Sequence, residues 1–254
     1  MKKIIVMTMA SSLIATIASA GTSVNVDFAS AYVFRGQTLV DDLVMQPGIE
    51  VDGFGMKEEC GTITLGVWGS AAPFSDTYDN LHETDWYLVY TLPELVTNLN
   101  LSIGFTEYQY NASFGEQEIN LAAAYALGDE VTVGGSANFM VDDENLLTED
   151  QIYVDLYADY AMEVSEDMDV SFGALVSMIK QGDGYDALGL DDGFNHYELY
   201  GAFDYSLNEM WSIGASLTYV GQLNNDVLPD NNTVPLFAGY DKGLVAMFSV
   251  GCEM

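Results

Sequence analysis

The chain has few basic residues. Among its 254 residues, Lys and Arg together number 6 against 39 Asp and Glu, which gives a formal net charge of -33 at pH 7. Binding of nucleic acid needs a basic surface that neutralises phosphates, so this balance excludes nucleic acid as a partner. Histidine is also scarce, with only His82 and His196. Because nucleophilic hydrolysis needs a histidine beside a serine or a carboxylate, we expect no enzyme activity and no cofactor.

After residue 21 the chain also lacks any run of about 18 apolar residues, so the sequence contains no candidate transmembrane helix. Nevertheless, 49% of its residues are hydrophobic, a high fraction for an acidic chain. The two observations agree if apolar residues alternate with polar ones along the strands of a membrane barrel, because alternation produces no apolar run.

The N-terminus predicts export. Lys2 and Lys3 precede an apolar run from Ile4 to Ile17, which ends in Ala18-Ser19-Ala20 before Gly21. A basic start, an apolar middle and small residues at the end are typical of a cleaved signal peptide. We therefore expect a signal peptide over residues 1–20 and a single barrel domain over 21–254. Cleavage leaves four basic residues, namely Arg35, Lys57, Lys180 and Lys242.

Strict alternation of apolar and polar residues recurs along the mature chain. In Ile152–Tyr160, for example, one face carries aliphatic side chains and the other carries Tyr153, Asp155, Tyr157 and Asp159. Successive side chains of a strand point to opposite faces, so this pattern predicts strands with one apolar and one polar face. We predict twelve strands, with ten as the alternative count: 23–34, 45–54, 61–71, 82–92, 99–109, 116–127, 130–141, 150–162, 168–179, 194–206, 210–222 and 243–252.

The connections between these strands predict an orientation. They alternate between tight links, such as Gly128-Asp129, and longer polar links, such as 180–193 and 221–242. Outer-membrane barrels have short periplasmic turns and longer external loops. We therefore expect an all-β, antiparallel, up-and-down barrel in a bacterial outer membrane, with both chain ends in the periplasm.

Aromatic residues on the predicted lipid face fall near the strand ends, as membrane interfaces favour. The predicted external girdle comprises Tyr32, Phe34, Phe139 and Tyr219, and the periplasmic girdle comprises Tyr125, Tyr160, Tyr205 and Trp211. A soluble β-sandwich with core aromatics is the alternative.

Several motifs resemble a known family. The stretch Tyr32-Val33-Phe34-Arg35-Gly36 resembles the opening signature of the TorF-type porins, and similar matches occur at Gln46–Val51, Gly66–Ser70 and Glu83–Tyr87. The resemblance covers roughly residues 24–90. It implies an outer-membrane barrel with a channel function and supplies neither substrate nor catalytic residues. The chain departs from the expected pattern at Leu39-Val40-Asp41 and at its C-terminus, which ends in Met254 where assembly usually requires Phe.

Arg35 is the only arginine in the chain. By alternation it faces the lumen at the external end of the first strand, near Glu50 and Asp52 and farther from Glu83 and Asp85. An arginine pairs well with a carboxylate. The pair either forms an eyelet that selects ions or ties the first strand to its neighbours.

Acidic residues dominate the predicted lumen face. The candidate pore-lining residues, besides Arg35, are Asp27, Glu50, Asp52, Glu83, Asp85, Glu118, Asp155, Asp159, Glu198 and Asp204. Carboxylates that line a narrow tube attract cations and repel anions. The sequence therefore predicts a porin for passive diffusion of small cationic or neutral solutes, and the alternative is a plugged structural or adhesive barrel.

The predicted external loops contain further acid clusters, including Asp142-Asp143-Glu144 and Asp191-Asp192. None has the spacing of a helix-loop-helix calcium site. We expect solvated loop charge and no metal site, with weak divalent bridging to lipopolysaccharide as the alternative. The expected partners are therefore outer-membrane lipid, lipopolysaccharide and small solutes.

Cys60 and Cys252 are the only cysteines. Their predicted strands lie three positions apart around the barrel, about 14 Å at ~4.8 Å per strand. That exceeds the Cα separation of ~7 Å that a disulfide permits. We therefore predict two free thiols.

Overall fold

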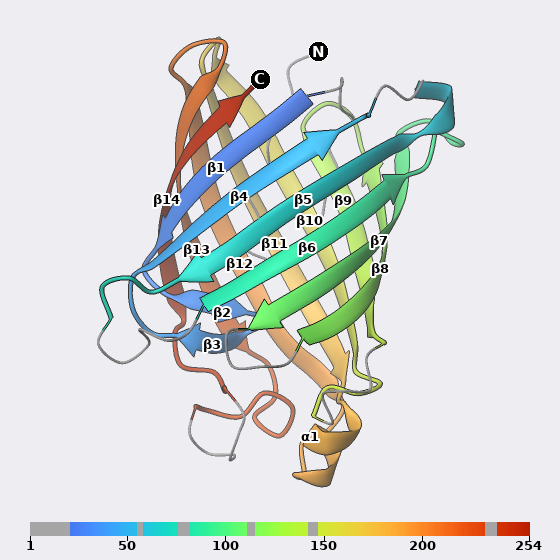
Figure 1. Cartoon of the computed structure of the whole chain (residues 1–254), viewed down its shortest axis with the longest axis vertical. Helices are drawn as coiled ribbons and strands as arrows, with labels where there is room; N and C mark the ends of the chain where they lie inside the picture. Colours follow the sequence, from blue (N-terminus) through green and yellow to red (C-terminus); the bar gives the residue numbers. More distant parts are fainter. Residues whose placement is uncertain (1–20, 55–57, 76–81, 111–114, 142–146, 232–237) are drawn as a thin grey trace.

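Twelve strands of the chain form one closed antiparallel barrel. The computed structural model describes residues 21–54, 58–75, 82–110, 115–141, 147–231 and 238–254. Each strand pairs with its neighbours in the chain, and β1 closes the barrel against β14 (Figure 1). The barrel strands are β1 (Gly21–Ala29), β4 (Val44–Asp52), β5 (Thr62–Ala71), β6 (His82–Thr91), β7 (Leu99–Tyr110), β8 (Gly115–Ala126), β9 (Val131–Met140), β10 (Ile152–Ser165), β11 (Met168–Lys180), β12 (Gly193–Ser206), β13 (Trp211–Gln222) and β14 (Leu244–Glu253).

These bounds confirm the predicted barrel and its strand number. Most ends agree with the sequence prediction to within about two residues. The largest difference is in the first strand, which ends at Ala29 and not at residue 34, and β10 also extends to Ser165 where the prediction ends at 162. The predicted signal peptide at 1–20 lies outside the described residues.

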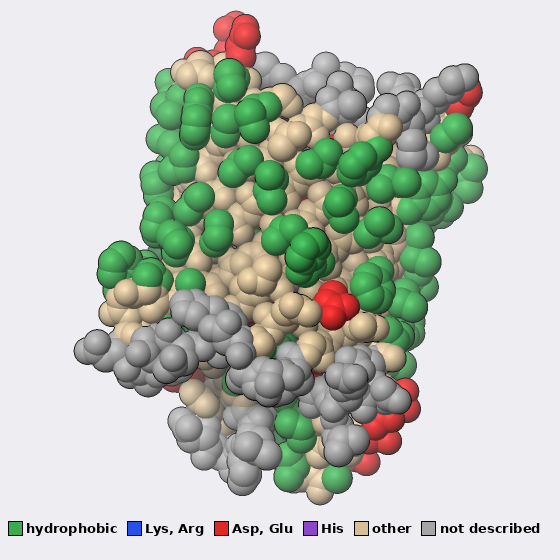
Figure 2. All heavy atoms as spheres, viewed as in Figure 1, with side chains coloured by type: hydrophobic (Ala, Val, Ile, Leu, Met, Phe, Trp, Pro, Cys, Tyr) green, Lys and Arg blue, Asp and Glu red, His purple; other side chains and the backbone are tan. Residues whose placement is uncertain are grey.

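The outer wall of the barrel is apolar. Leu65, Leu121, Leu156 and Leu217 are outward-facing residues of four different strands and are all exposed. Figure 2 shows hydrophobic side chains over most of the visible wall, with acidic groups concentrated towards its ends. Glu107 on β7 is a polar exception, and it accepts hydrogen bonds from the side-chain amides of Gln109 and Gln117.

The two ends of the barrel differ. Both chain ends of the barrel lie at one end, here called the turn end, together with the connections 53–61, 92–98, 127–130, 166–167 and 207–210 (Figure 1). The opposite end, the loop end, carries the connections 30–43, 72–81, 141–151, 181–192 and 223–243. The connection between β7 and β8 is also at the loop end but is short, so the alternation of loop lengths has one exception.

A hairpin folds into the barrel from the loop end. Its strands are β2 (Tyr32–Phe34) and β3 (Gln37–Val40), which pair only with each other (Figure 1). Its apolar side chains pack on inward-facing residues of β4, β13 and β14 in one cluster, which includes Tyr32, Val33, Val40, Val44, Val220, Val245 and Met247. The first connection therefore fills part of the lumen.

This hairpin corrects the predicted external girdle. Tyr32 is buried and packs on Trp68 inside the barrel, with ring centroids 5.6 Å apart, and Phe34 contacts the inward-facing Tyr108. The predicted lipid-facing positions of Tyr32 and Phe34 are wrong because the chain leaves the barrel wall after Ala29. By contrast, Tyr125, Tyr160, Tyr205, Trp211 and Tyr219 are exposed on the outer wall.

The loop end also carries the helix α1 (Asp183–Ala187). Tyr185 of α1 packs with Leu190 and Leu228, and Leu228 is fully buried. In the described part of the chain, no helix has the length and apolar character required to cross a membrane.

Both cysteines are free, as predicted from the strand positions. Cys60 is exposed in the short 3-10 helix η1 (Glu58–Cys60), whereas Cys252 is buried on β14. The strands β14, β1, β4 and β5 follow one another around the barrel, so three strand spacings separate the two regions.

Candidate pore lumen

The acidic candidate residues all face the interior of the barrel, and two environments distinguish them. Glu50, Asp52 and Asp204 are partly exposed although they point inward, whereas the other acidic candidates are buried. Partial exposure of an inward-facing side chain requires open space inside the barrel. The buried group comprises Asp27, Glu83, Asp85, Glu118, Asp155, Asp159 and Glu198.

Arg35 lies at the tip of the inserted hairpin. Arg35 and Gly36 are the two residues between β2 and β3, and their φ angles are 52° and 83°. Positive φ at both central residues is the backbone that tight hairpins favour. Gly36 also has no room for a side chain, because an added Cβ would lie 2.7 Å from Leu228 Cδ2 and 2.9 Å from His196 Cγ.

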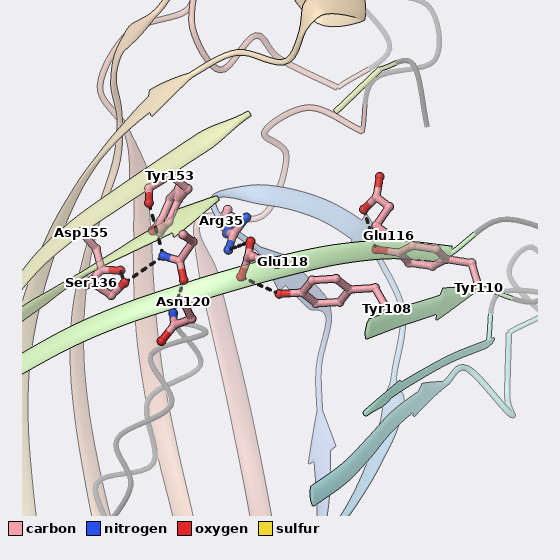
Figure 3. A network of polar contacts seen from close by, with 10 residues as sticks. Arg35, Tyr108, Tyr110, Glu116, Glu118, Asn120, Ser136, Tyr153 and Asp155 are labelled. Atoms are coloured by element: carbon pink, nitrogen blue, oxygen red, sulfur yellow. Dashed lines mark hydrogen bonds and ion pairs between the residues drawn. The ribbon is translucent and has the colours of Figure 1, made fainter. Parts of the chain in front are cut away.

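The hairpin tip is attached to the far wall of the barrel by Arg35. Its Nη2 donates to Glu118 Oε2 at 2.6 Å, and both side chains are buried (Figure 3). The guanidinium also lies 4.5 Å from the ring centroid of Tyr153, and the Arg35 carbonyl accepts from Asn195 Nδ2 at 2.9 Å. Burial is the largest single influence and lowers the pKa of Arg35, but the charge of Glu118, its hydrogen bond and the neighbouring Tyr108 and Tyr153 together raise the pKa above its ordinary value, so the guanidinium stays protonated.

The sequence predicts an inward-facing Arg35, which the structure confirms, but its position and partner differ from the prediction. It belongs to the hairpin turn and not to the first strand, and its partner is Glu118 on β8. Glu50 and Asp52 instead accept hydrogen bonds from Tyr87 and Thr64. The pairing with Glu118 joins residues 83 positions apart, which no local pattern indicates.

A ladder of polar side chains continues from Glu118 along the wall (Figure 3). Tyr108 Oη donates to Glu118 Oε1 at 3.1 Å. Asn120 donates to Asn138, which donates to Ser136 Oγ at 2.9 Å, and Ser136 donates to Asp155. These hydrogen bonds join β8, β9 and β10 and fix the wall against which the hairpin tip is held, although Asn120 Oδ1 and Asp155 Oδ1 have no hydrogen-bond partner among the described residues.

A bulge in β12 turns two consecutive side chains inward. The pairing of β11 with β12 shifts between Val176 and Met178, and both Asn195 and His196 are buried. Ser177 Oγ lies 2.8 Å from His196 Nδ1, and His196 Nε2 lies 3.2 Å from Glu198 Oε1. Ser177 is 1% exposed, and its hydroxyl also forms hydrogen bonds with the backbone N and O of His196. Ser177 therefore stabilises the bulge, and its hydroxyl is not accessible as a nucleophile.

Two other acidic candidates each accept a hydrogen bond from a tyrosine on the second strand along. Tyr87 Oη donates to Glu50 Oε1 at 2.6 Å, and Tyr200 Oη donates to Asp159 Oδ1. In each case a glycine lies directly between the two residues in the sheet: Gly66 pairs with both Glu50 and Tyr87, and Gly173 pairs with both Asp159 and Tyr200. A Cβ on either glycine would overlap the tyrosine ring that crosses it.

Alternation along single strands does not reveal these two carboxylate-glycine-tyrosine rows. Each row depends on the register of three neighbouring strands, whereas alternation reports one strand at a time. A sequence signal does exist, since an inward-facing glycine in one strand and an inward-facing tyrosine in the next recur in both rows.

Two further acidic candidates accept hydrogen bonds from neighbouring side chains. Asn25 Nδ2 donates to Asp27 Oδ2 at 2.8 Å, and Thr64 Oγ1 donates to Asp52. Within the described ranges, no three His, Cys, Asp or Glu side chains lie close enough together to hold a metal ion.

No protein-family model and no curated protein matches the chain. Solved structures, in contrast, match nearly its whole length. The NanC porin shares 8% identity at a TM-score of 0.54, covering 91% of this chain and 98% of its own. The KdgM porin shares 10% identity at a TM-score of 0.53, covering 91% and 97%.

The COG4313 outer membrane channel from Pseudomonas putida F1 is likewise similar, with 12% identity and a TM-score of 0.55 over 93% of this chain and 96% of that one. At these identities the likeness concerns the fold alone. The resemblance to the TorF-type porins stays a prediction. The chain has the fold of outer-membrane porins and channels.

Proposed function

We propose that the protein is an outer-membrane channel for passive diffusion of small cationic or neutral solutes. The observation that carries this proposal is the division of the barrel into an apolar outer wall and an inner wall lined by carboxylates and hydroxyls. Lipid stabilises the first surface and water or ions the second. The short connections then face the periplasm, the long loops face outward, and residues 1–20 act as the cleaved signal peptide.

Charge supports the solute preference. The described residues that face the lumen include many carboxylates, whereas Arg35 is buried against Glu118 and contributes little free positive charge. One KdgM structure holds disordered oligogalacturonate. An acidic oligosaccharide of that kind would be repelled by the lumen of this chain, so we expect the opposite charge preference here.

The inserted hairpin favours a second candidate function. It buries the acidic residues at the loop end, and a barrel closed there would serve as a structural or adhesive protein whose acidic loops contact lipopolysaccharide or another partner. The inward-facing but partly exposed Glu50, Tyr87, Tyr157 and Tyr200 favour a channel, because they line open space below the hairpin.

Single-channel recording in planar bilayers distinguishes the two functions. We expect the folded wild-type protein to produce ion-conducting steps, and the Arg35→Ala variant to produce larger or longer ones. If neither protein conducts while both migrate on gels as folded barrels, the channel proposal is wrong and the structural function stands.

A further inference from the structure

We propose that Glu50 and Asp159 are the residues that determine charge selectivity, acting as two fixed carboxylates on opposite sides of the lumen. This inference rests on the proposed channel function and assigns its selectivity to two named side chains. Its basis is the pair of carboxylate-glycine-tyrosine rows, Glu50-Gly66-Tyr87 on β4, β5 and β6, and Asp159-Gly173-Tyr200 on β10, β11 and β12.

Each row holds its carboxylate in place. The tyrosine ring lies across the glycine, because glycine has no side chain to occupy that space. The phenol hydroxyl then donates a hydrogen bond to the carboxylate on the third strand. Because the ring lies along the wall, it narrows the lumen less than a ring that projects inward.

The two rows lie on opposite sides of the barrel. Around its closed order, β4 and β10 are six strands apart among twelve. With ~4.8 Å between strands and a tilt of about 40°, the circumference is about 75 Å and the backbone diameter about 24 Å.

The strand register allows the heights of the two carboxylates to be compared on β8. Directly paired residues connect Glu50 to Glu118 of β8 through Gly66, Tyr87 and Thr106. They connect Asp159 to Ala126 of β8 through Thr132. Glu118 and Ala126 are about 26 Å apart along β8 at ~3.3 Å per residue. Such rows of paired residues descend toward the loop end from β4 to β10, as the tilt of the strands shows (Figure 1).

The tilt then gives the heights. At about 40°, Glu50 lies ~12 Å nearer the turn end than Glu118, and Asp159 lies ~14 Å nearer. With the same tilt and spacings, Glu50 and Asp159 are about 39 Å apart along the circumference, which is about half of the full circumference. Glu50 and Asp159 therefore face each other across the lumen, on the turn-end side of the hairpin tip.

Their exposure gives each a distinct way of acting on an ion. Glu50 is partly exposed to the interior and can contact a passing cation. Asp159 is 4% exposed, and its Oδ2 has no hydrogen-bond partner among the described residues, so it acts through its field. The Debye length of about 8 Å at physiological ionic strength is comparable to the reach from each carboxylate to the barrel axis.

A purely structural explanation of the rows also exists. Aromatic rings cover glycines on the outer wall as well, where Phe172 lies beside Gly201 and Tyr197 beside Gly221. Aromatic side chains compensate for glycine in sheets without any role in transport. The rows of Glu50 and Asp159 add a carboxylate at the third position, whereas the inward-facing Gly134, which Tyr157 crosses, has Ala124 there. Removal of the charge alone therefore separates the two explanations.

The test compares two doubly substituted proteins of equal charge. Glu50→Gln with Asp159→Asn removes the paired carboxylates but keeps an oxygen that can accept from each tyrosine. Asp52→Asn with Asp204→Asn removes two other lumen carboxylates, near the turn end. Reversal potentials in a KCl gradient give the ratio of potassium to chloride permeability, and heat-dependent gel migration verifies the folding of each protein.

We expect the ratio to fall about fivefold in the first variant, the factor that corresponds to about 1 kcal/mol for a unit charge near an ion in water. It should fall clearly less in the control. The wild-type ratio should also drop from 0.1 M to 1 M salt, as the Debye length shrinks from about 10 to 3 Å.

An unchanged ratio in the first variant, or an equal fall in the control, overturns the assignment of Glu50 and Asp159. Absence of conductance in the wild-type protein and in Arg35→Ala instead overturns the channel function itself, so the two failures are distinguishable.

Discussion

Gly36 is the residue on which the shape of the hairpin depends most. Its φ of 83° suits glycine, and an added Cβ would collide with Leu228 and His196. The resemblance motif Tyr32-Val33-Phe34-Arg35-Gly36 thereby has a physical meaning: it contains one strand of the inserted hairpin together with its turn.

Gly36→Ala should therefore weaken the seating of the hairpin by about 1–3 kcal/mol, from strain at positive φ and the close contacts. We expect larger single-channel currents and faster proteolysis of the segment 30–43. Gly189→Ala is a suitable control, because Gly189 also has a positive φ, 91°, but an added Cβ there meets nothing within 4 Å. Equal effects of the two substitutions would contradict the role of packing at Gly36.

The two cysteines should differ in reactivity. Cys60 is exposed at the turn end, whereas Cys252 is buried near the outer wall beside Trp211. A maleimide should label Cys60 in the folded protein and Cys252 only after unfolding, as read by mass spectrometry without reducing agent. A linked pair of cysteines would show that the strand order at the closure of the barrel is wrong.

At the scale of elements, the Arg35–Glu118 ion pair attaches the hairpin to the far wall of the barrel. Removing one partner of a buried ion pair costs about 3–5 kcal/mol, because the other charge is left buried and unpaired. Arg35→Ala should lower the free energy of unfolding by about this amount, unless the hairpin leaves the lumen and Glu118 gains water. In the second case we expect increased conductance with little loss of stability.

The exposed ion pair of the same hairpin region provides a control. Lys242 Nζ lies 2.8 Å from Asp41 Oδ1, and the two side chains are 40% and 34% exposed. Such pairs contribute about 0–1 kcal/mol, so Lys242→Ala should change neither stability nor conductance by much. If Arg35→Ala behaves like Lys242→Ala in both measurements, Arg35 does not hold the hairpin.

The hairpin also shows where prediction from sequence fails at this scale. Alternation continues through Tyr32-Val33-Phe34 and extends the predicted first strand to residue 34, because period two identifies a strand but not the sheet to which it belongs. Arg35-Gly36 is a turn with positive φ, yet a lone glycine is a weak turn signal. The barrel strands themselves are predictable because lipid outside and water inside impose a strict difference between their faces.

At the scale of the whole molecule, alternation also predicts which acids face inward, since facing depends only on position within a strand. It does not predict which residues meet across the lumen. The partner of Arg35, the bulge at Asn195 and His196, and the opposition of Glu50 to Asp159 all depend on closure, register and tilt. These quantities are properties of the closed barrel and of no single segment.

The closed barrel should resist detergent. Without heating, the protein in sodium dodecyl sulfate should migrate as a compact species, and heating should shift it to the position of the unfolded chain. Every backbone hydrogen bond in a closed barrel is internal, so the detergent must open the whole sheet to unfold it. Identical migration with and without heating would favour a soluble β-protein.

The reversal potential of the wild-type channel across a gradient of dilute KCl measures whether the lumen prefers cations. We expect a potential of the sign that marks preference for potassium, because carboxylates line the open part of the lumen and the one lumenal arginine is paired with Glu118. A potential near zero, or one that marks preference for chloride, would contradict it.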